Sequence, residues 1–214
     1  SQVRQAVRAW TPQGQRLYGE ADGLPHEVVY SLVADGQGGA WAGTHRGLVH
    51  WQRGRIEHVQ PAGLGSVGII SLKLDSRGRL WLGTLDHGLA LLEGDSVRKF
   101  GEAQGGSDRT IWSIAEDAQG TIWAGTNGDG VLRVTDAGVT RLTTRNGLAS
   151  NFIWQVLRDS REDIWLFGNL GLNRLSGTSI HHYGRGSGLI ELEGAAGAAF
   201  EDAAGSLWFG TGSG

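Results

Sequence analysis

The sequence of 214 residues has no cysteine, no methionine and only 3 prolines. Without cysteine the chain forms no disulfide, has no thiolate nucleophile and offers no sulfur ligand to a metal ion. It also lacks any apolar run of the roughly 18 residues that a membrane span needs, and its start at Ser1 matches neither a signal peptide nor a myristoylation motif. We therefore expect a chain that is not itself inserted in a membrane, and the missing methionine suggests a piece of a longer protein.

Neither positive nor negative charge is in large excess. The chain has 19 basic and 22 acidic residues without long runs of either, for a formal net charge of −3. This balance lacks the basic footprint that a phosphate backbone attracts, so we expect no nucleic acid partner. A hydrophobic fraction of 39% with 9 tryptophans indicates a folded domain rather than a disordered one. The 37 glycines have no three-residue period, which excludes a collagen, and at this density they disfavour long helices.

The glycines belong to an internal repeat. The pattern Asp-x-x-Gly-x-x-Trp occurs five times, with the glycine replaced by Glu162 in the fourth copy. The copies begin at Asp35, Asp75, Asp117, Asp159 and Asp202, and each aspartate precedes by six residues one of Trp41, Trp81, Trp123, Trp165 and Trp208. Four copies continue as Trp-x-Gly-Thr, whereas the fourth reads WLFG. The tryptophans are 40, 42, 42 and 43 residues apart, a period that indicates repeated blades or solenoid turns.

Each repeat divides into four short apolar runs separated by turn residues. In the second repeat we expect strands at 69–74, 79–83, 88–92 and 97–100, with a turn at Asp75–Gly78. No segment sustains a helical period, so helix should be nearly absent. A four-stranded meander repeated every 40 to 45 residues is one blade of a β-propeller, because a single meander cannot bury both of its faces.

The two ends of the sequence are complementary. Residues 7–10 and 16–18 match strands three and four of a repeat, and 195–201 and 207–210 match strands one and two. We therefore predict an all-β, five-bladed β-propeller of four-stranded antiparallel blades, whose last blade joins the C-terminal strands 1–2 to the N-terminal strands 3–4. This is a single domain over 1–214, with repeats at about 22–62, 63–104, 105–146, 147–187, and 188–214 joined with 1–21. The alternative is a piece of a larger propeller whose ends pair with another copy through blade edges.

The repeat consensus, together with Gly147-Leu148 before a strand one and Gly171-Leu172-Asn173 after a strand two, resembles the two-component regulator propeller repeat. The resemblance covers essentially the whole chain. It implies a periplasmic sensor region of a bacterial membrane receptor that ends in a histidine kinase or diguanylate cyclase module. Propellers of that family commonly have seven blades, whereas this chain carries five repeats. Any signalling output would lie outside these residues.

In such a propeller the loops that enter strand one and those that join strands two and three surround one mouth of the central channel. We expect a ligand site there. Serines of these loops, Glu191 and Glu193 belong to the same face. The candidate ligand-binding residues are His26, Glu27, His45, Arg46, Asp86, His87, Asp108, Arg109, Trp112, Asn127, Asp129, Asn151, Trp154 and Asn169. The alternative for any one of them is an ordinary solvated loop residue.

The aromatic residues fall into two groups. The five repeat tryptophans are expected to pack between blades. Tyr30, Trp112 and Trp154 share another position, five residues before the turn aspartate, where the other repeats have Ile70 and Gly197. These rings have two possible roles. Near a channel mouth they can stack on a sugar ring or a base, and the alternative is plain packing between blades.

Metal binding is not expected. The repeat aspartates should cap their own turns rather than form a cation-binding ring, and the seven histidines show no zinc-ligand pattern. The question whether His26, His45 and His87 meet in space stays open.

No nucleophile elbow, phosphate loop or dinucleotide fingerprint is present, so we expect no catalytic activity and no cofactor. The leading hypothesis is a non-catalytic ligand-sensing propeller whose ligand is a small molecule or an oligosaccharide. One alternative is a structural or engineered propeller scaffold or fragment without a specific ligand. A third candidate is an enzyme like the streptogramin lyases, which are propellers with a similar Gly-x-x-Trp run.

Overall fold

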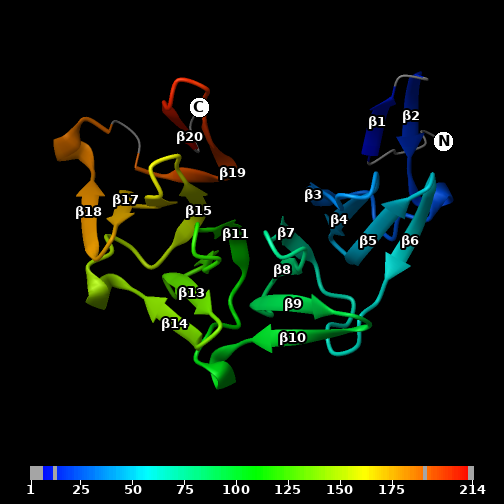
Figure 1. The fold of residues 1–214 in the computed structure, drawn as a ribbon, viewed down its shortest axis with the longest axis horizontal. Coiled ribbons are helices and arrows are strands. Elements are labelled where there is room, and N and C mark those ends of the chain that lie inside the picture. Colours follow the sequence, from blue (N-terminus) through cyan, green and yellow to red (C-terminus); the bar gives the residue numbers. More distant parts are fainter. Residues whose placement is uncertain (1–6, 12–13, 190–191, 212–214) are drawn as a thin grey trace. The chain divides into compact units, whose positions relative to one another are not determined.

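The computed structural model describes residues 7–11, 14–189 and 192–211. The chain divides into two compact units, most of whose strands are labelled in Figure 1. The first comprises Ser1–Leu85 with Ala90–Arg98, and the second comprises Asp86–Leu89 with Lys99–Gly214.

The described residues are almost entirely β-structure. Four antiparallel sheets have four strands each, taken in sequence order. They consist of β3 (Val29–Ala34), β4 (Ala40–Thr44), β5 (Gly47–Gln52) and β6 (Arg55–Val59); β7 (Ile69–Leu74), β8 (Leu80–Thr84), β9 (Leu89–Glu93) and β10 (Ser96–Phe100); β11 (Ile111–Glu116), β12 (Ile122–Thr126), β13 (Val131–Thr135) and β14 (Gly138–Leu142); and β15 (Ile153–Arg158), β16 (Ile164–Gly168), β17 (Gly171–Ser176) and β18 (Ser179–Tyr183). The only helices in the described ranges are 3-10 turns of three residues, at Glu20–Asp22, Glu102–Gln104, Thr144–Asn146 and Arg185–Ser187. The prediction of an all-β fold of four-stranded blades is confirmed.

Two further sheets have two strands each. β1 (Val7–Thr11) pairs with β2 (Gly14–Tyr18) in the first unit, and β19 (Gly194–Glu201) pairs with β20 (Leu207–Thr211) in the second. By their place in the repeat they are strands three and four and strands one and two of a fifth blade. Each half has the internal pairing that the sequence predicts for it.

The turn between strands one and two owes its shape to the repeat aspartate. In the second blade Asp75 Oδ1 accepts the backbone N–H of Arg77 (3.0 Å) and of Arg79 (2.8 Å). Gly78 closes the turn at φ 75°, a left-handed conformation that favours glycine. Asp75 Oδ2 also accepts the indole N–H of Trp81 at 2.9 Å. The aspartates therefore cap turns, as predicted, and in four of the five repeats they also accept the indole N–H of the repeat tryptophan.

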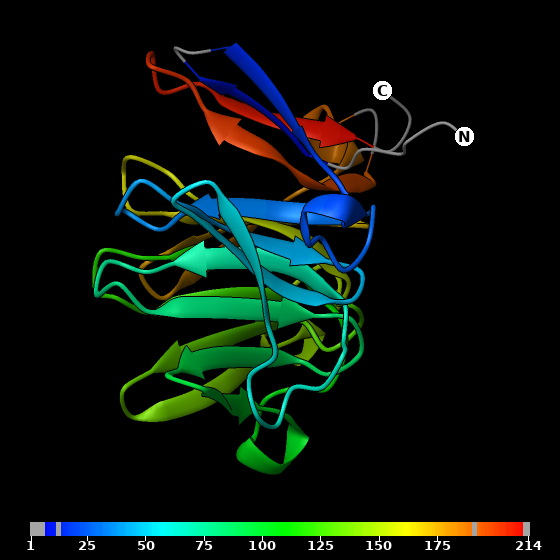
Figure 2. The same ribbon diagram turned by 90° about the vertical axis from the view of Figure 1, so that its right-hand side faces the viewer.

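Neighbouring blades pack through their first strands. In the first unit β3 and β4 contact β7, and Figure 2 shows this layering of the first sheet beside the second. In the second unit β11 contacts β15, and β15 contacts β19. Polar bonds reinforce the apolar core, because Ser113 Oγ accepts the backbone N–H of Val156 (3.1 Å) in the next blade. Blade stacking therefore fixes each first strand relative to the next within its unit.

The repeat tryptophans are not all buried. Trp81 and Trp123 are 2% and 8% exposed, as expected for residues that pack between blades. Trp208 is 56% exposed, so the expectation is wrong for this residue. The reason is that Trp208 lies on β20, in the last sheet of its unit, where no later blade of that unit follows it.

Candidate functional site

A β-bulge displaces one residue on the first strand of each four-stranded blade. The pairing register shifts between Val29 and Ser31, and likewise at the corresponding place in the next three blades. The displaced residues are Tyr30, Ile70, Trp112 and Trp154. Bulges re-aim a side chain away from the regular pleat and are common next to functional sites. The residue type at this position varies between repeats, and the bulge directs its side chain away from the regular pleat of the strand.

Two of these residues line an open hollow in the second unit, with a volume of about 400 Å³. Its walls are Trp112 of β11, Trp154 of β15, Asn127 after β12, and Glu193, Gly194 and Ala196 at the start of β19. Both indoles are half-buried and Glu193 is exposed. Trp112 Nε1 is buried without a hydrogen-bond partner in the described part of the chain. An unpaired buried donor costs about 1–3 kcal/mol, so the position of this indole carries a cost in stability.

The backbone around this hollow is held by its neighbours. The Asn127 N–H donates to the Thr110 carbonyl (3.0 Å), and Asn127 bridges to Phe152 of the next blade. The Gly171 N–H donates to the Leu192 carbonyl (2.9 Å), which fixes the approach to β19. A Cβ on Gly194 would lie 2.8 Å from the Phe167 ring, so only glycine fits there. The hollow is thus built from blades that pack closely.

Three predicted site residues bind other loop residues. Asp86 Oδ1 accepts the hydroxyl of Thr110 (2.8 Å), Asp129 Oδ2 accepts that of Ser107 (2.7 Å), and Asn169 Oδ1 accepts that of Ser150 (2.5 Å). Ser107, Thr110 and Ser150 are buried. These side chains therefore tie the loops into strand one to the loops between strands two and three.

Asn151 has a similar local role, since its Oδ1 accepts the backbone N–H of Thr144 (2.8 Å). Asp108, Arg109 and His87 are exposed on loops of the second unit. In the first unit Arg46 is exposed and Glu27 is half-buried. A ligand-binding role for these five residues stays a prediction.

His26 and His45 meet in the first unit, with ring centroids 5.0 Å apart. Tyr30 shares a hydrogen bond with His45 Nδ1 (3.0 Å), and His26 Nδ1 accepts the backbone N–H of Val28 (3.0 Å). Within the described residues no three potential metal-ligating side chains of histidine, cysteine, aspartate or glutamate gather in one place. The pair is therefore a polar contact between two loops.

The sequence-based list misses three residues of the hollow, Glu193, Gly194 and Ala196, of which Glu193 has a polar side chain. Glu193 belongs to the loops of the predicted face, but it is not among the fourteen candidates, whereas Trp112, Trp154 and Asn127 are. In the sequence, only the position of Glu193 just before a predicted first strand indicated that it belongs to this face. No motif marks it, because its role depends on the course of the chain between 192 and 196.

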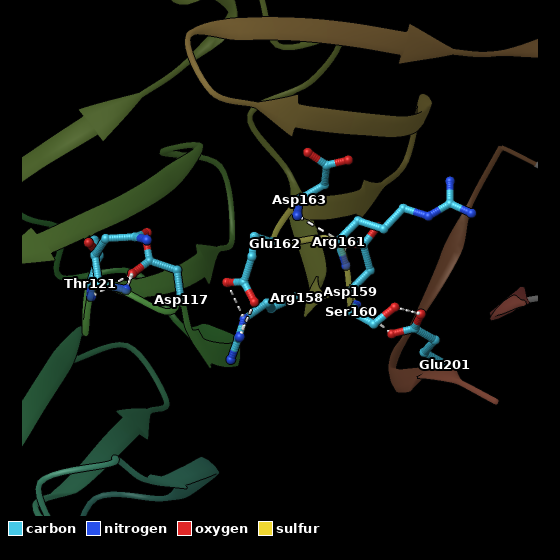
Figure 3. Close-up of polar contacts among 10 residues, drawn as sticks. Asp117, Thr121, Arg158, Asp159, Ser160, Arg161, Glu162, Asp163 and Glu201 are labelled. Carbon is cyan, nitrogen blue, oxygen red and sulfur yellow. Dashed lines mark hydrogen bonds and ion pairs between the residues drawn. The ribbon is translucent and has the colours of Figure 1, made fainter. Parts of the chain in front are cut away.

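A second group of charged side chains lies near the turns between strands one and two. Ser160 donates from both its backbone N–H and its hydroxyl to Glu201 (2.6 Å each), which joins the fourth blade to β19 (Figure 3). The hydrogen bond from Trp208 is the main cause that holds the pKa of Asp202 below its usual range. These carboxylates are occupied by turn and blade contacts, which indicates a structural role.

The structure describes no helix with the length and apolar character of a membrane span. No curated protein matches the chain.

Solved structures share the fold. The extracellular domain assigned to the one component system BT4673 of B. thetaiotaomicron aligns at 19% identity and a TM-score of 0.64, over 97% of this chain and 36% of that one. The extracellular domain assigned to the hybrid two component system BT3049 of the same organism aligns at 23% identity and 0.54, over 88% and 32%. Virginiamycin B lyase from Staphylococcus aureus aligns at 17% identity and 0.69, over 87% and 68%. The chain spans about a third of the two receptor domains, and at these identities the likeness shows the fold alone.

Blades of four antiparallel strands, stacked through their first strands, define a β-propeller protein. Three of its repeats match a known family model, that of the Two component regulator propeller, at residues 23–46, 63–86 and 105–128.

Proposed function

We propose that the chain is a non-catalytic ligand-sensing module from the extracytoplasmic, periplasmic part of a bacterial signalling receptor. The observation that carries the proposal is the coincidence of the regulator repeat with a hollow lined by two bulged indoles. The two receptor domains with the same fold are extracellular, which supports the location.

An oligosaccharide is the ligand class that the hollow favours. Indole rings offer broad apolar faces to the C–H face of a sugar, and few other side chains provide as much contact area. Glu193 and Asn127 supply a carboxylate and an amide that pair with hydroxyl groups. A site with few polar groups on an apolar floor is typical of small-molecule recognition.

Binding to an array of neutral and acidic oligosaccharides tests the proposal. Wild-type protein should bind at least one of them saturably. The double variant Trp112→Ala, Trp154→Ala should weaken that binding by about tenfold or more, because each stacked ring contributes on the order of 1 kcal/mol. Isothermal titration of the best ligand gives the affinities.

The matched control is Phe200→Ala, which removes an aromatic ring of the same unit outside the hollow. Phe200 is 57% exposed and stacks on Trp208, so its loss should leave ligand binding unchanged. If the folded wild-type protein binds none of the oligosaccharides, the ligand class is wrong. If a variety of other small molecules also gives no saturable binding, a scaffold without a ligand is the better description.

A further inference from the structure

The first blade departs from the tryptophan contact of the other four copies. In those copies the indole N–H donates to the repeat aspartate, from Trp81 to Asp75, Trp123 to Asp117, Trp165 to Asp159 and Trp208 to Asp202, at 2.8 to 2.9 Å. In the first blade His50 Nε2 donates to Asp35 Oδ2 instead, at 2.9 Å. The Trp41 ring stacks on His50, with centroids 3.9 Å apart and planes 7° from parallel. His50 has thus displaced the indole from its usual acceptor.

The cause lies on the paired strand. His50 of β5 is the register partner of Trp41 of β4, and the same position holds Arg133 opposite Trp123 and Arg174 opposite Trp165. Those arginines lie over the indole faces, at 5.9 and 5.7 Å from the ring centroids, and leave the aspartate to the indole N–H. A histidine is shorter and reaches the aspartate itself. One substitution within the repeat therefore releases the Trp41 donor.

The released donor lines a cavity of about 420 Å³ between the first and second blades, within the first unit. Trp41 Nε1 has no hydrogen-bond partner among the residues that the structure describes. Arg79 lines the opposite wall. Its Nε donates to Asp75 at 2.7 Å and its guanidinium lies over the Trp81 ring at 5.5 Å, but its two terminal nitrogens make no hydrogen bond within the described ranges. The cavity therefore offers N–H donors from both blades.

The carboxylate of the cavity wall is already occupied. Asp35 Oδ1 accepts the backbone N–H of Gln37 (2.7 Å) and of Gly39 (2.8 Å), and Oδ2 accepts His50. The rest of the wall includes the apolar side chains Leu74, Leu80 and Leu92. A ligand that fits this surface brings hydrogen-bond acceptors, preferably with a negative charge for Arg79, and an apolar body for the leucines.

We propose that this cavity is a second ligand site, which takes a small organic carboxylate with an apolar body. The carboxylate accepts from Trp41 Nε1 and the terminal nitrogens of Arg79, and the apolar body lies on the leucines. The site is separate from the hollow at Trp112 and Trp154, which lies in the other unit.

Benzoate, phenylacetate and hexanoate are suitable probes, with benzyl alcohol and hexanol as uncharged counterparts. Ligand-observed NMR and isothermal titration on the whole chain measure their binding. We expect saturable binding of at least one carboxylate at millimolar concentration, about tenfold or more tighter than its alcohol, because a charge-assisted hydrogen bond is lost in the alcohol.

Two variants test the site itself. Trp41→Phe removes the donor, and His50→Leu removes the competing imidazole without adding a charge, so that the indole N–H returns to Asp35 as in the other four copies. Each should weaken carboxylate binding by about tenfold or more while the β-sheet circular dichroism spectrum is retained. The matched control is Arg133→His in the third blade, which should leave the affinity unchanged.

The proposal is overturned if no carboxylate binds saturably up to roughly 10 mM, or if binding survives both Trp41→Phe and His50→Leu. Should Trp41→Phe fail to fold, His50→Leu alone decides, because it keeps every side chain of the cavity except the histidine. Loss of oligosaccharide binding in the Trp112 and Trp154 variant bears only on the other site.

Discussion

Arg158 and Glu162 form an ion pair across the turn that begins at Asp159, and Glu162 holds it from a left-handed backbone conformation with φ 72° (Figure 3). Glycine occupies this place in the other four repeats, for example Gly120 at φ 76°. A non-glycine residue costs about 1–3 kcal/mol in this region, whereas an exposed ion pair returns about 0–1 kcal/mol. The contact therefore offsets only part of the backbone strain.

We predict that Glu162→Gly unfolds with a higher free energy than Glu162→Ala, by about 1 kcal/mol. Both variants lose the ion pair with Arg158, but only the glycine relieves the strained backbone. Urea unfolding followed by circular dichroism measures the difference. Arg158→Ala is the control, since it removes the pair and keeps the strain, and it should resemble Glu162→Ala. Equal stability of the glycine and alanine variants would contradict the strain argument.

The contact between tryptophan and aspartate gives a second prediction. Trp123→Phe removes a hydrogen bond to the Asp117 carboxylate (2.9 Å), which costs about 1–3 kcal/mol because the acceptor is charged. Trp41→Phe loses a similar volume but no such bond, since Asp35 is occupied by His50. Thermal unfolding should therefore show a clearly larger loss for Trp123→Phe. A loss that is the same for both would mean that ring volume alone decides.

These contacts show how far the sequence could lead. The period of about 42 residues predicts blades, strand order and turns, because each depends on residues close together in the chain. The bond from Trp81 to Asp75 could have been inferred from their constant spacing of six, yet a β-bulge or a displaced indole could not. Those depend on which side chain stands opposite on the paired strand, as His50 does for Trp41. The hollow needs Glu193, whose position follows from how β19 packs on Phe167.

The turn aspartates make stability depend on pH. Burial raises the pKa of Asp75, but the hydrogen bonds from Trp81 and Arg79 outweigh it, so the pKa lies below the ordinary value of 3.8. His50 is the main cause of the lowered pKa of Asp35. Because the folded-state pKa values are depressed, their stabilising effect is complete above the unfolded pKa and is lost as the pH falls through the folded value.

We therefore predict that the free energy of unfolding changes little with these groups above about pH 5 and falls steadily below about pH 4. Urea unfolding at a series of pH values measures this. Asp75→Asn should be less stable at neutral pH and should show a shallower decline in acid, since one of the titrating carboxylates is gone. An unchanged slope in this variant would exclude Asp75 as a contributor.

The last prediction concerns the two-stranded sheets β1–β2 and β19–β20. A sheet of two strands is marginally stable alone and presents an unpaired edge. The repeat predicts that strand two of the C-terminal sheet continues into strand three of the N-terminal sheet. In the first blade Ala40 pairs with Trp51, and the corresponding residues of a joined fifth blade are Leu207 and Trp10.

Since the chain has no cysteine, Leu207→Cys with Trp10→Cys introduces one defined pair of thiols. Mild oxidation should give a crosslinked monomer, seen by its altered mobility without reductant and by a monomer mass in light scattering. The control pair, Trp10→Cys with Ala203→Cys, places one thiol in the exposed turn before β20 and should stay unlinked. Disulfide-linked dimers from the first pair would instead mean that two chains complete each other's blade.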